Sequence, residues 1–90
     1  MERSLTEQQA VALRYDPKEG DSAPRVIAKG SGYIAEQILR IARENNIPLR
    51  QDPELAGALA TLDIGSAIPQ ELFQAVAEIL AFIYKMNGKA

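Results

Sequence analysis

The 90-residue sequence contains neither cysteine nor histidine. Without cysteine there are no disulfides, no thiolate ligands for zinc or iron–sulfur clusters, and no cysteine nucleophile. Without histidine there is no Ser-His-Asp triad, no HExxH zinc helix and no side chain whose ordinary pKa lies near neutrality. Catalysis would have to depend on carboxylates, lysine or tyrosine, and we expect no catalytic residues, no metal, no cofactor and no enzyme activity.

Long apolar runs and excess positive charge are also missing. The longest unbroken apolar run, Ile79–Tyr84, is far shorter than the roughly 20 residues that a membrane-spanning helix needs. Residues 1–9 hold no apolar stretch of the kind that a signal peptide requires. The formal net charge is −2, whereas nucleic-acid binders usually carry a basic face. We therefore expect a cytoplasmic protein that neither enters a membrane nor binds nucleic acid.

The length and composition are those of one small domain. Apolar residues make up 47% and charged residues 24% of the chain, which is ordinary for a globular protein. About 90 residues leave room for one core and no second domain. We expect a flexible N-terminal segment over residues 1–8, the domain over residues 9–87 and a tail over residues 88–90.

Two strands are predicted in the first third of the chain. Residues 10–15 alternate apolar side chains, and residues 25–28 form a second short apolar run. The segment between them is rich in proline and glycine, which predicts a long turn. Its acidic residues, Glu19 and Asp21, are expected to be solvated, as most surface carboxylates are.

Three helices and a third strand are predicted in the remainder. The helices cover about residues 32–45, 53–61 and 69–86, and residues 47–51 are predicted as a strand. In the first helix an isoleucine stripe, with two alanines beside it, should face the core; it consists of Ile34, Ile38 and Ile41 beside Ala35 and Ala42. The order β-β-α-β-α-α predicts an α/β fold with a small mixed sheet of about three strands, wrapped by helices. Strands two and three should be parallel and strand one antiparallel.

A glycine-rich segment offers one alternative function. Gly30-Ser31-Gly32 lies between a predicted strand and helix, and Asp52 follows about 20 residues later, the layout of a dinucleotide-binding site. Such a site spans two strand–helix–strand units, and only one is predicted here. Asp52 is also well placed to cap the helix that Pro53 begins. Lys29 beside the glycines is expected to be a solvent-exposed lysine. A minimal nucleotide- or anion-binding domain therefore stays open as the second hypothesis.

Several collinear segments resemble one family. Nearly the whole chain, about residues 9–86, is similar to the C-terminal cytoplasmic domain of the flagellar and type III secretion export switch proteins, the FlhB/YscU/SpaS/EscU family. The resemblance rests on residues 10–16, 23–30, 41–48, 53–56, 64–69 and 75–81. It implies that family's fold, a small mixed sheet wrapped by helices, and a role in switching the secretion apparatus between hook-type and filament-type substrates.

The chain departs from this family at the self-cleavage motif. Family members cut themselves within an Asn-Pro-Thr-His loop, where the asparagine side chain attacks its own backbone carbonyl. The matching positions here are Leu5, Thr6, Glu7 and Gln8. Because neither the asparagine nor the proline is present, we expect no self-cleavage. We further expect a stand-alone homologue of the cleaved C-terminal fragment, able to take its place.

The resemblance also suggests partners and a docking site. Expected partners are flagellar export gate proteins, export substrates and the membrane half of the full-length switch protein. In the flagellar members, substrates are thought to dock near an Ala-Pro pair before the second strand and on an apolar flank of the last helix. Those positions here are Ala23, Pro24, Ala77 and Leu80. The apolar stripe of helix 69–86 is wider than one core contact needs, so either the helix is central in the fold or one flank docks a partner. A homo-oligomer held by this helix is a third option.

Overall fold

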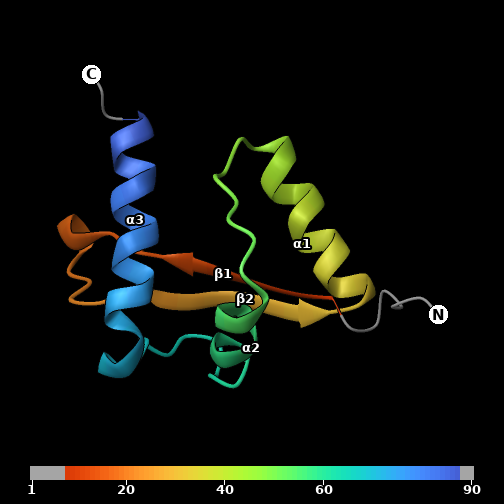
Figure 1. Ribbon diagram of the computed structural model, residues 1–90, viewed down its shortest axis with the longest axis horizontal. Coiled ribbons are helices and arrows are strands. Elements are labelled where there is room, and N and C mark those ends of the chain that lie inside the picture. Colours follow the sequence, from red (N-terminus) through yellow and green to blue (C-terminus); the bar gives the residue numbers. More distant parts are fainter. Residues whose placement is uncertain (1–7, 88–90) are drawn as a thin grey trace.

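The computed structural model describes residues 8–87 as a β-hairpin with three α-helices around it (Figure 1). The expected N-terminal segment, apart from Gln8, and the tail 88–90 lie outside these residues. The elements are β1 (Gln9–Arg14), a 3-10 turn (Pro17–Glu19), β2 (Arg25–Ser31), α1 (Tyr33–Glu44), α2 (Pro53–Leu59), a second 3-10 turn (Gln70–Leu72) and α3 (Phe73–Asn87).

The two strands pair antiparallel, as predicted for strand one. Ala12 lies opposite Ala28 and Leu13 opposite Val26, so Ile27 is an extra residue on β2 and forms a β-bulge. β2 is longer than predicted because Gly30 and Ser31 continue the ladder opposite β1. Glycine weakens a strand but does not end it.

The predicted third strand is wrong. The described residues form one two-stranded sheet, and residues 47–52 lie outside any strand. The side chains of Ile47 and Leu49 are 53% and 49% exposed, so their alternation does not correspond to a buried face. The chain leaves α1 through Asn46 in the left-handed region (φ 56), and Ile47 N donates to Ala42 O at 2.8 Å. Helix α1 is therefore not a crossover between parallel strands, although the expected α/β fold is confirmed.

One face of the hairpin is made of small residues and carries α1. Gly30 and its partner Ala10 lie opposite one another, as do Ala12 and Ala28, and paired residues point to the same face. Ile34 of α1 lies directly over Gly30. This close approach buries the helix's alanine edge, Ala35 and Ala42, and leaves Ile34 and Ile41 half exposed. Of the residues predicted to face the core, Ala35 and Ala42 are buried and Ile38 is partly buried, whereas Ile34 and Ile41 are not.

The core lies on the other side of the hairpin. Its buried centre is Leu59 of α2, Ile68 and Val76 of α3. The apolar residues packed around it come from β1, from α2 and the segment after it, and from the second 3-10 turn and α3: Val11, Leu13, Leu55, Leu62, Leu72 and Leu80. Lys29 donates from Nζ to the carbonyl oxygens of Ala60 and Leu62 at 3.0 and 2.7 Å. It therefore binds the C-cap of α2 at Ala60 and the chain just beyond it at Leu62 rather than standing in solvent.

Helices α1 and α3 lie toward opposite ends of the hairpin (Figure 1). Helix α3 stands beside the loop that joins β1 to β2, and α1 starts at the other end, where β2 stops. The predicted last helix is divided, because Gln70–Leu72 form a 3-10 turn before α3 begins at Phe73. Among residues 8–87, no helix combines the length and the apolar character needed to cross a membrane.

Candidate functional site

An apolar hollow of about 180 Å³ lies between the β1–β2 loop and α3. All four residues expected to dock export substrates, Ala23, Pro24, Ala77 and Leu80, line it. The other lining residues are Tyr15, Ser22, Ile68, Phe73 and Val76. Two segments more than forty residues apart in sequence thus form one concave surface, and Tyr15 and Ser22 are its lining residues with polar side-chain groups.

The floor of the hollow is fixed by main-chain hydrogen bonds. Ile68 N donates to Pro24 O at 2.9 Å, and Val26 N donates to Ser66 O at 3.0 Å. An isolated antiparallel bridge joins Arg25 to Ala67 between them. The Ala23–Pro24 pair is therefore held against the chain that leads into α3.

The α3 wall follows the helical period. Phe73, Val76, Ala77 and Leu80 are spaced i, i+3, i+4 and i+7, which puts them on one face of the helix. Val76 is buried in the core and Leu80 packs against it, whereas Ala77 is exposed. A small residue between larger apolar ones leaves the depression that the hollow occupies.

Asp21 does not line the hollow but precedes the lining residue Ser22, and the prediction that it is solvated is wrong. Its side chain is 6% exposed rather than solvated. Arg14 donates to it from Nη2 at 2.9 Å and from Nε at 3.2 Å, and Asp16 N donates at 3.0 Å. Arg25 Nε lies 3.6 Å away. The hydrogen bond from Arg14 is the largest cause that lowers the pKa of Asp21 below its ordinary value. The signal in the sequence was the pair of arginines at the two strand ends that flank the loop.

The residues of the nucleotide hypothesis do not form such a site. Gly30 and Ser31 belong to β2, and Gly32, at φ 60, is the N-cap of α1 and donates to Gln8 O at 2.9 Å. Asp52 accepts from Leu55 N at 3.1 Å as the N-cap of α2. No strand follows α1, so the strand–helix–strand unit that the hypothesis needs is absent from residues 8–87.

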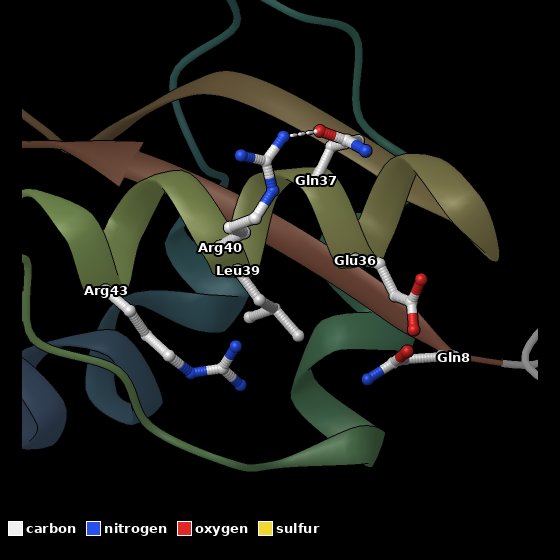
Figure 2. Close-up of a pocket in the computed structure, with 6 residues that line it drawn as sticks. All are labelled: Gln8, Glu36, Gln37, Leu39, Arg40 and Arg43. Carbon is white, nitrogen blue, oxygen red and sulfur yellow. Dashed lines mark hydrogen bonds between the residues drawn. The ribbon is translucent and has the colours of Figure 1, made fainter.

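A second, larger hollow of about 410 Å³ lies along α1 and reaches Gln8 (Figure 2). Figure 2 shows Arg43, Leu39 and Glu36 on one side of the helix, with Gln8 beside Glu36, while Arg40 binds Gln37 above. Its lining mixes both signs of charge. Over the described part of the chain, no group of three potential metal ligands comes together. Of the four positions expected to replace the self-cleavage motif, only Gln8 lies within the described residues.

The sequence matches the model of the FlhB HrpN YscU SpaS family over residues 7–83. The chain belongs to this family. Membership assigns it to the flagellar and type III protein export proteins, and the resemblance seen in the sequence is confirmed.

Relatives and solved structures agree on the part of the family that is matched. The chain is 46% identical to the flagellar biosynthetic protein FlhB of Escherichia coli over 79 residues, 87% of this chain but 20% of that protein. It is 42% identical to the protein YlqH of Bacillus subtilis, covering 87% of this chain and 83% of that protein. The cytoplasmic domain of FlhB from Shewanella putrefaciens superposes with a TM-score of 0.83 at 43% identity, covering 90% of this chain and 68% of that one.

A second solved structure, from PscU, shows that the matched region is a C-terminal domain. The PscU C-terminal domain has a TM-score of 0.77 at 35% identity and is covered to 96%, with 84% of this chain aligned. The chain thus corresponds to a C-terminal cytoplasmic domain and spans about a fifth of the full-length FlhB relatives. The fold of residues 8–87 is that of the FlhB cytoplasmic domain and of the PscU C-terminal domain.

Proposed function

We propose that the chain acts as a non-enzymatic docking module of the type III export apparatus. In this role it takes the place of the C-terminal fragment of the export switch protein and binds apolar segments of export substrates. The observation that carries the proposal is the convergence of Ala23, Pro24, Ala77 and Leu80 on one apolar hollow. The Bacillus subtilis relative, most of which this chain matches, supports the idea that a domain of this extent acts as its own chain.

The size of the hollow fits a small apolar ligand group. A volume of about 180 Å³ corresponds to roughly six waters at about 30 Å³ each. Replacing them with one large aliphatic or aromatic side chain would gain at most about 1.5–3 kcal/mol, the value for complete burial, because the hollow is open to solvent on one side. A gain of that size gives weak, reversible docking, which suits a substrate that must be released into the export channel.

Export gate proteins and the membrane half of the full-length switch protein are the proposed further partners. Self-cleavage has no part in this function, because Leu5, Thr6, Glu7 and Gln8 supply neither the asparagine nor the proline of the family motif. The chain would then act constitutively in the switched state.

A complementation experiment tests the proposal. The host is a flagellated strain whose switch protein lacks its C-terminal fragment, and the chain is expressed separately. Secreted hook and filament proteins and motility are scored. We expect the wild-type chain to restore export, and Ala77→Glu to abolish the restoration by placing a charge in the hollow.

Ala75→Glu is the matched control. It makes the same change on the same helix, at an exposed position about 200° around the helix from Ala77. Both variants must be present at wild-type level and folded by circular dichroism. Equal export by the two variants, or no restoration by a folded wild-type chain, would refute docking at this hollow.

A further inference from the structure

We propose that Asp21 is a positioning residue for the hollow, because its carboxylate holds the β1–β2 loop in the shape that docking needs. This inference rests on the proposed function and adds the element that controls the site. The loop carries four of the nine lining residues, Tyr15, Ser22, Ala23 and Pro24. Its conformation therefore sets one side of the hollow.

Asp21 joins three parts of the chain through one buried carboxylate. Arg14, at the end of β1, donates two hydrogen bonds, and Arg25, at the start of β2, adds an ion pair at 3.6 Å. Asp16 N donates to Oδ2 while Asp21 N donates back to Asp16 O at 3.2 Å. The loop is thus closed on itself and fastened to both strand ends within three residues of Pro24.

The two sides of the hollow are held by different forces. The α3 wall is fixed by apolar packing, because Val76 is buried in the core cluster. The side that contains Ala23 belongs to a turn-rich loop, and the side chains that hold this loop are Asp21 and its two arginine partners. Removing the negative charge would lose charge-assisted hydrogen bonds and leave two arginines facing each other across an uncharged side chain. The loop would then shift relative to α3, and the hollow would lose its shape.

Arg25 extends this group toward the chain before α3. Its Nη1 donates to Gly65 O at 2.9 Å, in the same segment that pairs with Pro24 and Val26. The charged group therefore contacts both segments that meet at the floor, which makes it a control point for the whole hollow.

The test is a binding measurement on the purified full chain with isobutanol, a mimic of a leucine side chain. Alanine methyls are labelled with carbon-13, and the shifts of the Ala23 and Ala77 methyl signals are followed during the titration. We expect saturable shifts at both methyls in the wild type. Asp21→Asn should raise the dissociation constant for isobutanol about threefold to tenfold, because a loop that is no longer fixed must be ordered on binding.

Glu19→Gln is the matched control, because it removes the same charge from an exposed position of the same loop. It should leave the dissociation constant unchanged. Arg14→Lys keeps the positive charge but loses the two-point geometry, and it should weaken binding to an intermediate degree, which keeps the test valid if Asp21→Asn fails to fold. Binding by folded Asp21→Asn, or by Arg14→Lys, within the error of the wild type would overturn the proposal.

The outcome is separable from that of the proposed function. Isobutanol binding does not depend on any export machinery, so a weakened Asp21→Asn supports the positioning role even if Ala77→Glu restores export. In that case the hollow is a binding site but not the export docking site. If isobutanol shifts neither methyl of the wild type, the hollow is no binding site and the positioning role fails.

Discussion

Adding one methyl group at Gly30 should destabilise the domain, because the space is already taken by α1. A Cβ built there would lie 2.6 Å from the Cβ of Ile34, whereas carbon atoms in contact are about 3.5–4.0 Å apart. Rotating the Ile34 side chain cannot relieve a contact with its Cβ, so the start of α1 must move by about 1 Å. Overpacking of this kind costs about 1–3 kcal/mol, and we expect Gly30→Ala to lower the free energy of unfolding by about 1–2 kcal/mol.

Thermal melts by circular dichroism give the measurement. A loss of about 1 kcal/mol lowers Tm by about 4–8 °C in a domain of this size. Gly57→Ala is the matched control, since Gly57 lies inside α2 and a Cβ there would meet Gln9 Oε1 at an ordinary 3.6 Å. It should gain about 0.5–1 kcal/mol from helix propensity. A Gly30→Ala protein as stable as the wild type would refute the reasoning and leave the glycine open to a ligand-binding explanation.

Three further outcomes are expected. Asp52→Ala should cost about 0.5–2 kcal/mol in chemical denaturation, because it removes the N-cap that accepts from Leu55 N. The second outcome concerns the stability of the domain in acid. The pKa of Asp21 lies below its ordinary 3.8, chiefly because of the hydrogen bond from Arg14. Its contribution to stability is therefore complete above about pH 5 and is lost as the pH falls through the lowered pKa. Asp21→Asn should remove that part of the acid dependence. Mass spectrometry of the purified chain should show one intact 9.8 kDa species; a fragment ending within residues 5–8 would contradict the absence of self-cleavage.

Periodicity predicted the elements that bury one face. Strand β1 was found because its apolar residues alternate, and β2 because it is a short apolar run before a glycine-rich segment. The helices were found from an apolar repeat of about 3.6 residues and from their capping and proline signals. The segment 47–51 also alternates, yet Ile47 and Leu49 stay exposed and Pro48 offers no N–H to a partner. The exposure of Ile34 and Ile41 on α1 could not be predicted either. It depends on the small residues of the facing strands, which let the alanine edge approach and leave Ile34 beside Gly30.

The candidate site was only partly predictable. The wide apolar stripe of the last helix indicated a surface that could bind a partner. The prediction that Ala23 and Pro24 belong to the same site came from the family resemblance. Spacing within either segment does not say how α3 packs across the loop. Asp21 was assigned to solvent because surface statistics favour that for a turn carboxylate. Its burial depends on Arg14 and Arg25, which come together only once the hairpin has formed.

The two hollows share no lining residue and belong to opposite ends of the hairpin. A reporter group can therefore be attached at one end without obstructing the other. A fluorophore or cross-linker on a cysteine introduced at Glu36 would be the sole thiol in the chain. Such a label could follow the encounter of the domain with the export machinery while the α3 hollow stays open to a substrate.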